Sequence, residues 1–147
     1  MPPLRVAALN TPQIRPSRDG RSLANCGHME PLELKERTMR FALSVASLCR
    51  SLTHEWQGRR VADQMFRSAT SVAANYHAAC RARSRREFVA KVGVVAEEAD
   101  ETIFWLHFAV RSGMLMEAPA KPLMREAREL LAIFIASAKT AAANTRP

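Results

Sequence analysis

Residues 84–113 read SRREFVAKVGVVAEEADETIFWLHFAVRSG, and this stretch decides the fold class. It opens with a capping box, in which the Ser84 hydroxyl accepts from a free backbone N–H and the Glu87 carboxylate reaches back. A helix should therefore begin at Arg85, and Gly113 is suited to end it in a left-handed cap. Apolar residues recur every three or four positions between these ends, which predicts one buried face. That face comprises Phe88, Val92, Val95, Ala99, Ile103, Leu106 and Val110.

Two segments before this helix show the same periodicity. The first is predicted as a helix over residues 31–54, ending near His54 to Gly58, where the glycine supplies a stop and a short loop. The second carries its apolar face on α-helical spacing up to the turn before Ser84. The two apolar faces comprise Leu34, Thr38, Phe41, Val45, Leu48 and Leu52, then Val61, Met65, Ala69, Val72, Tyr76 and Cys80.

A fourth helix is predicted after a loop that Pro119 and Pro122 punctuate. Its apolar face comprises Leu123, Ala127, Leu130, Phe134 and Ala138. Four amphipathic helices with short connections predict an all-α, antiparallel up-down-up-down four-helix bundle. No strand pattern competes with this interpretation.

The composition fits one domain with a leader in front of it. The chain has 147 residues, of which 48% are hydrophobic and 24% charged, and this suits a single core. Residues 1–28 hold four prolines and little periodicity, so we interpret them as a disordered leader and residues 29–147 as the bundle. Because Met29 directly precedes the first periodic segment, an alternative is an upstream extension created by a misplaced start codon.

The cysteine pattern argues against metal and disulfide chemistry. Cys26, Cys49 and Cys80 lie far apart and are odd in number, so neither a zinc site nor a disulfide framework is predicted. Cys49 and Cys80 are interpreted as small buried apolar residues, which suits a reducing cytosol. Charges break every apolar stretch before 18 residues, so we expect a cytoplasmic protein without a membrane partner. No cofactor is expected.

The segment from Gln64 to Phe88 resembles a known family. Its pattern is Q-x-x-R-A-x-x-S-V/I-x-x-N, an arginine-containing turn and then S/T-x-x-E-F, which opens a long helix with an acidic middle and a glycine end. The chain is similar here to the four-helix bundle proteins related to those encoded in large-subunit rRNA intervening sequences, which include the accessory protein of diversity-generating retroelements. The matching positions are Gln64, Arg67, Ala69, Ser71, Val72, Asn75, Ser84, Glu87, Phe88, residues 97–101 and Gly113.

The resemblance covers roughly residues 34–137 and carries its own expectations. It implies an antiparallel bundle that forms a ring-shaped homopentamer, with basic surfaces proposed to meet RNA or a protein partner. No enzymatic activity is attached to the family. Many members follow the asparagine with Ile-Ala-Glu-Gly, whereas this chain continues from Asn75 with residues 76–80, YHAAC, so no role of that Glu-Gly turn is carried over.

The acidic run, residues 97–101, places four carboxylates in the middle of the long helix. A di-iron bundle needs Glu-x-x-His, and no glutamate of this chain has a histidine at that spacing, so no metal site is predicted. On a helical wheel the run points mostly away from the apolar face. We favour a subunit interface over plain solvation, with this face meeting a basic face of the preceding helix. The residues assigned to that interface are Arg60, Arg67, Ser71, Ala74, Glu97, Asp100 and Glu101.

The basic turn connects the second and third helices. It comprises Arg81, Arg83, Arg85, Arg86 and Lys91. The N-terminal N–H groups of the third helix add positive potential there, which favours a sequence-tolerant phosphate contact with RNA. A solvated loop that only keeps the protein soluble is an equal alternative.

Catalytic chemistry is not predicted anywhere in the chain. His54, His77 and His107 are scattered over three helices without a nucleophile or carboxylate at motif spacing. Asn75 is expected to tie its helix to another helix or to the basic turn. We therefore predict a non-enzymatic oligomeric binding or scaffold protein without a small-molecule substrate, contacting RNA or a nucleic-acid-handling protein. The alternative is a purely structural protein–protein interaction module.

Overall fold

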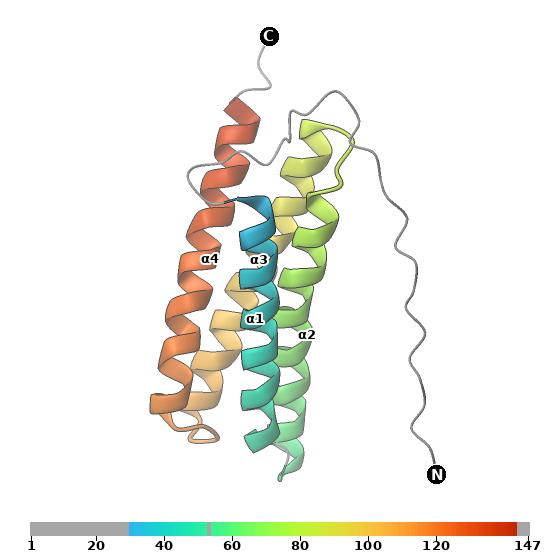
Figure 1. The fold of residues 1–147 in the computed structure, drawn as a ribbon. Coiled ribbons are helices and arrows are strands. Elements are labelled where there is room, and N and C mark those ends of the chain that lie inside the picture. Colours follow the sequence, from blue (N-terminus) through green and yellow to red (C-terminus); the bar gives the residue numbers. More distant parts are fainter. Residues whose placement is uncertain (1–29, 53, 144–147) are drawn as a thin grey trace, which may run out of the picture.

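The computed structural model describes residues 30–52 and 54–143, which form a bundle of four helices (Figure 1). In chain order the elements are α1 (Pro31–Cys49), the short 3-10 helix η1 (Arg50–Leu52), α2 (Trp56–Ala79), α3 (Arg85–Arg111) and α4 (Glu117–Ala143). Consecutive helices run in opposite directions, so the α2–α3 turn lies at one end of the bundle and the other two connections lie at the opposite end (Figure 1). The predicted all-α up-down-up-down bundle is confirmed. The predicted leader, residues 1–28, lies outside the described residues.

One apolar core runs along the bundle, and all four helices contribute to it. Its largest fully buried side chains include Phe134, Met65, Leu106 and Leu130. Aromatic packing joins α2 to α4, because the rings of Tyr76 and Phe134 lie with centroids 5.3 Å apart. The seam positions predicted from sequence are buried or half-buried in the structure.

The ends of α3 follow the prediction, with one difference of detail. Ser84 caps the helix by accepting a 3.1 Å hydrogen bond from the Glu87 backbone N–H. The Glu87 carboxylate reaches back one residue further than expected and accepts from the Arg83 backbone N–H at 2.9 Å. At the other end Gly113 adopts φ 75°, the left-handed conformation that favours glycine.

Gly58 does not end a helix, so that part of the prediction was wrong. The first helix gives way at Cys49 to η1, and Gly58 lies in the first turn of α2. A Cβ at this glycine would lie 2.1 Å from the carbonyl oxygen of Leu52. Glycine is therefore required because η1 passes directly against the start of α2.

Pro119 and Pro122 lie inside α4 rather than in a loop, which corrects a second expectation. Pro119 is the third residue of the helix, where backbone N–H groups have no acceptor within the helix. Pro122 is the sixth residue and deprives one carbonyl of its donor, yet the helix continues to Ala143.

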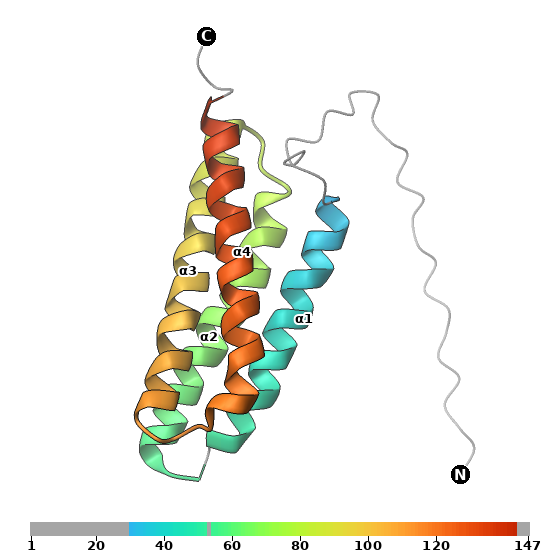
Figure 2. The ribbon, with the colours of Figure 1, turned by 90° about the vertical axis from the view of Figure 1, so that its left-hand side faces the viewer.

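The arrangement of α1 differs from that of the other helices. Figure 2 shows the N-terminal half of α1 leaning away from α4, while α2, α3 and α4 stay closely packed. Arg37 bridges the two helices by donating from Nε to Glu126 at 2.6 Å and from Nη2 to Glu129 at 2.6 Å. None of the described helices is both long and apolar enough to cross a membrane.

Candidate functional site

The basic turn lies at the N-terminal end of α3. Its arginines at positions 81, 83, 85 and 86 are exposed. Lys91 is half-buried nearly two turns into the helix, with its Nζ 3.8 Å from the Glu87 carboxylate. Lys91 is therefore partly neutralised, and the positive charge that faces solvent comes from the four arginines.

The nearest acid does not cancel this charge. Glu87 is the only acidic residue between Asp63 and Glu97. Its carboxylate is engaged with the Arg83 backbone N–H and with Lys91. Because helix N-termini carry a partial positive charge, the turn combines side-chain and backbone sources of positive potential.

The predicted interface residues lie on the outer faces of α2 and α3, which are neighbours in the bundle. Arg67 of α2 forms an ion pair with Glu101 of α3 within one chain, with Nη2 and Oε1 2.5 Å apart. The same carboxylate oxygen accepts from Trp105 Nε1 at 3.1 Å. The structure thus brings together two residues that the sequence assigned to an interface between chains.

The remaining predicted interface residues are not joined to one another. Arg60, Ala74, Glu97 and Asp100 are exposed, and Ser71 is half-buried. The structure therefore places them on adjacent outer faces, and no ion pair joins them among the described residues.

Glu98 differs from its acidic neighbours because it turns partly inwards. Burial raises the pKa of its carboxyl above the usual range, and the nearby Glu101 carboxylate raises the pKa further. Arg67 acts in the opposite direction. The Oε2 atom of Glu98 is buried and has no hydrogen-bond partner in the described part of the chain. A charge at this position is therefore costly to the folded state.

An aromatic cluster on α3, made of Phe104, Trp105 and Phe108, was missed by the sequence analysis. The Trp105 ring meets the edges of its neighbours with centroids 5.0 and 5.7 Å away, and the two phenylalanine rings stack at 6.3 Å. Both phenylalanines are exposed, so the cluster covers the outside of the bundle. The sequence does contain an indication of the cluster: Phe104 and Phe108 are four residues apart, so they share one helix face, and both lie outside the predicted apolar face.

Asn75 contradicts the expectation of a tie to another element. Its Nδ2 donates to the Ser71 carbonyl oxygen, one turn earlier in α2, at 2.9 Å. The bond lies within a single helix because the side chain folds back along the helix surface.

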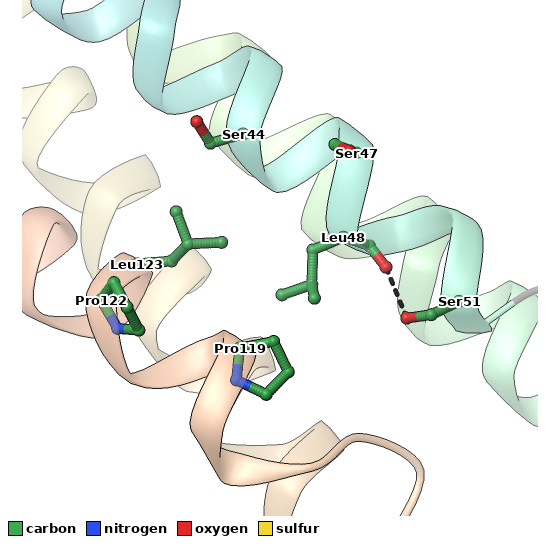
Figure 3. A pocket seen from close by; sticks show the side chains of 7 residues that line it. All are labelled: Ser44, Ser47, Leu48, Ser51, Pro119, Pro122 and Leu123. Atoms are coloured by element: carbon green, nitrogen blue, oxygen red, sulfur yellow. Dashed lines mark hydrogen bonds between the residues drawn. The ribbon is translucent and has the colours of Figure 1, made fainter.

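A shallow groove of about 430 Å³ lies between α1 and α4 (Figure 3). Leu48 and Leu123 face each other across it, Pro119 and Pro122 line one wall, and the Ser51 hydroxyl donates to the Leu48 carbonyl at 2.7 Å. The lining brings no charged or nucleophilic constellation, so we assign no chemistry to this groove.

Metal and thiol chemistry find no support in residues 30–52 and 54–143. These residues contain no group of three or more histidines, cysteines or acids that could hold a metal ion. Burial raises the pKa of the Cys49 thiol to about 11, so the thiol stays protonated at neutral pH. Cys49 is buried as predicted, whereas Cys80 is only half-buried.

Comparison with known proteins assigns the fold to a family. A family model described as 23S rRNA-intervening sequence protein matches residues 30–136. The chain belongs to the 23S rRNA-intervening sequence protein family. The matched region holds the basic turn and the outer faces of α2 and α3, and the resemblance predicted from residues 64–88 is confirmed.

A solved structure supports the same assignment. It is a protein with unknown function from the S23 ribosomal protein family of Bacteroides thetaiotaomicron, with a TM-score of 0.65 and 27% sequence identity. The alignment covers 69% of this chain and 94% of that chain. A comparison with curated proteins found no match. Neither the family description nor the structure's description names an enzymatic activity.

Proposed function

We propose that this 23S rRNA-intervening sequence family protein is a non-enzymatic, cytoplasmic oligomeric scaffold that binds the phosphate backbone of RNA through the basic turn. The observation that carries the proposal is the exposure of Arg81, Arg83, Arg85 and Arg86 around the N-terminus of α3, where the carboxylate of Glu87 is already engaged. Guanidinium groups and free helix N–H groups are the usual donors to phosphate oxygens.

The position of the turn also favours a one-sided contact. It lies at one end of the bundle, beside the N-terminus of α1 (Figure 1). Glu30 occupies the N-cap position of that helix and Glu33 lies in its first turn, so these acids place negative charge on the α1 side of this end and the arginines place positive charge on the α2–α3 side. In a closed ring, which the family resemblance suggests is a homopentamer, symmetry would present every copy of the turn on the same side.

Two glutamate substitutions test the RNA contact. Arg83→Glu with Arg85→Glu should weaken binding of a labelled single-stranded RNA at least about tenfold, measured by fluorescence anisotropy. Neither side chain belongs to the core, so helicity should be retained. The control is Arg59→Glu with Arg125→Glu, which makes the same charge change at exposed positions towards the opposite end of the bundle. Equal weakening by both double variants would show a diffuse charge effect and contradict the proposal.

The second candidate function is a structural module whose partner is a second copy of the chain and which has no role with nucleic acid. The exposed aromatic cluster beside the acidic run favours it, because such a surface suits protein contact better than phosphate contact. Absence of RNA binding by an assembled wild-type protein would select this alternative.

A further inference from the structure

The two phenylalanines of the aromatic cluster, Phe104 and Phe108, have no role in the core or in the proposed RNA contact. Phe104 and Phe108 are 57% and 42% exposed, although large apolar side chains are normally buried. They lie in the C-terminal part of α3, away from the basic turn at its N-terminus. The three rings already pack on one another, so docking would immobilise little side-chain freedom. A preorganised apolar surface of this kind indicates a protein contact.

The surrounding charges indicate what kind of surface covers the cluster. The acidic run supplies carboxylates at positions 97, 98, 100 and 101. The nearby cations are Arg111, three residues beyond Phe108, and Arg128 of α4, whose Nη2 lies 2.7 Å from His107 Nε2. Only Glu101 has an ion-pair partner among the described residues. The C-terminus of α3 adds negative potential. The covering surface should therefore be cationic, and a nucleic acid is disfavoured.

The outer face of α2 has the required character. Arg60 and Ala74 are exposed on it, two turns before and two turns after Arg67, so all three share one face. Arg60 has no ion-pair partner in residues 30–52 and 54–143. The small side chain of Ala74 permits close approach of another helix. A second copy of this chain thus presents the complementary surface.

Symmetry fixes which residues would meet. A contact between two different faces closes into a ring by rotation without translation. If the ring axis is parallel to the bundle, residues that meet across the interface lie at the same height in the protomer. The Arg67–Glu101 pair, with the Ser68 and Thr102 hydroxyls 2.9 Å apart, defines one common height on α2 and α3.

Because α2 and α3 are antiparallel, two further pairs of residues also lie at equal heights along the bundle. Arg60 precedes Arg67 by seven residues and Phe108 follows Glu101 by seven, so both lie about 10 Å towards the same end. Ala74 and Val94 are displaced by seven residues in the opposite sense. The outer faces of α2 and α3 therefore match at three heights along the bundle. Arg60 is level with the Phe108 ring, and Arg67 is level with the Glu101 carboxylate. Ala74 is level with the exposed side chain of Val94.

We infer that the outer face of α2 of one copy docks on the outer face of α3 of the next, with Arg60 stacking on the aromatic cluster and Ala74 packing against Val94. This inference rests on the self-assembly part of the proposed function and deepens it by naming the contact. Arg60 then gains a cation–π contact with an aromatic partner, while Arg67 stays beside Glu101 and approaches the unpaired Glu97 and Asp100 of the neighbour.

Light scattering on matched variants tests the docking surface. Phe108→Ala and Arg60→Glu should each lower the molar mass of the assembly at micromolar concentration, while circular dichroism stays unchanged because neither side chain is buried. The control for Phe108 is Met39→Ala, since Met39 is 41% exposed and lies on α1, which does not touch α3. The control for Arg60 is Arg59→Glu, the neighbouring exposed arginine. Both controls should keep the wild-type mass.

Cysteine cross-linking tests the register. In a background with Cys26→Ser and Cys80→Ser, chains carrying Ala74→Cys and chains carrying Val94→Cys are co-expressed and oxidised. A mixed disulfide-linked pair that neither variant forms alone is expected. A disulfide formed by one variant alone would indicate a two-fold contact and overturn the inference.

The outcomes separate this inference from the proposed function. An assembled protein whose mass resists both substitutions and which forms no mixed disulfide would overturn the docking surface, while self-assembly would stand. A monomeric wild type would overturn self-assembly and the docking surface together, and it would leave the RNA contact of the basic turn intact.

Discussion

Arg67 on α2 and Glu101 on α3 form an ion pair within one chain, with their atoms 2.5 Å apart on the outside of the bundle. The two side chains are 55% and 33% exposed, so solvent screens the attraction. Such a pair contributes about 0.5 kcal/mol. The pair marks a common height on the two helices whose outer faces we propose to meet across the assembly.

Reversing the charge of Arg67 should loosen the assembly more than it unfolds the protomer. Arg67→Glu adds a fifth carboxylate beside the acidic run, and in the assembly it would face the neighbour's acids as well. We expect a loss of about 2 kcal/mol in association and of about 1 kcal/mol in protomer unfolding. Light scattering and urea unfolding measure the two effects. An unchanged molar mass would argue against this face as the contact.

Gly58 should tolerate no side chain, because a Cβ would lie 2.1 Å from the Leu52 carbonyl oxygen. Gly58→Ala is expected to lower the free energy of unfolding by about 1–3 kcal/mol through forced displacement of η1. Gly93 is a matched control, since it lies inside α3 with open space around the missing Cβ. Gly93→Ala should stabilise the protein by about 0.5–1 kcal/mol. Chemical denaturation measures the free energy of unfolding of both variants. Equal changes at the two sites would contradict the explanation that Gly58 is required by the close approach of Leu52.

Arg37 should be the polar tie that holds α1 against α4. Its side chain is 19% exposed, and it donates to both Glu126 and Glu129. Arg37→Ala should cost about 1–2 kcal/mol, because it removes charge-assisted hydrogen bonds and leaves two carboxylates adjacent. Arg40→Ala, an exposed arginine one turn later on α1, is the control. Hydrogen exchange should show faster opening of α1 in the Arg37 variant only, and slow exchange throughout would contradict this role.

Glu98 should make stability depend on pH. Its pKa is raised in the folded state by burial and then by Glu101, so folding favours the protonated form. The loss of folding stability caused by ionising Glu98 is absent below the pKa that Glu98 has in the unfolded chain. It develops as pH rises to the higher pKa of the folded state and is complete above that pKa. Glu98→Gln should therefore raise the thermal midpoint at pH 7 and lose this advantage near pH 4. Glu97→Gln, at an exposed neighbouring position, is the control for the loss of one carboxylate from the acidic run. A gain in the thermal midpoint of the Glu98→Gln variant that is independent of pH would contradict the charge explanation.

Most of the fold was predictable because helical periodicity and capping are local signals. Ser84, Glu87 and Gly113 marked the ends of α3 correctly. Gly58 was misread because a helix stop and a close backbone approach use the same residue, and only the tertiary position of Leu52 distinguishes them. The prolines of α4 were misread as a loop. Pro119 lies in the first turn, where the backbone N–H has no acceptor within the helix, and Pro122 lies beyond it, where the helix continues despite one missing hydrogen bond.

The candidate surfaces were predictable only in part. The exposure of the four arginines follows from their place in the α2–α3 turn or in the first turn of α3, outside every apolar face. The Arg67–Glu101 pair required the relative height of α2 and α3, which periodicity does not supply. Phe104 and Phe108 lay outside the predicted apolar face, yet their packing on Trp105 depends on side-chain geometry that a wheel cannot show. The buried hydroxyl contact of Ser68 with Thr102 was hidden because both are polar.

The salt dependence of RNA binding tests the central claim most directly. Each phosphate contact on a single strand contributes about −0.7 to the slope of log affinity against log salt, so four arginines predict a slope of roughly −3 for the wild type. Arg83→Glu with Arg85→Glu should reduce the steepness to less than about half, because two contacts are lost and two like charges are added. A wild type that binds without salt dependence, or a double variant with an unchanged slope, would contradict phosphate binding by the basic turn.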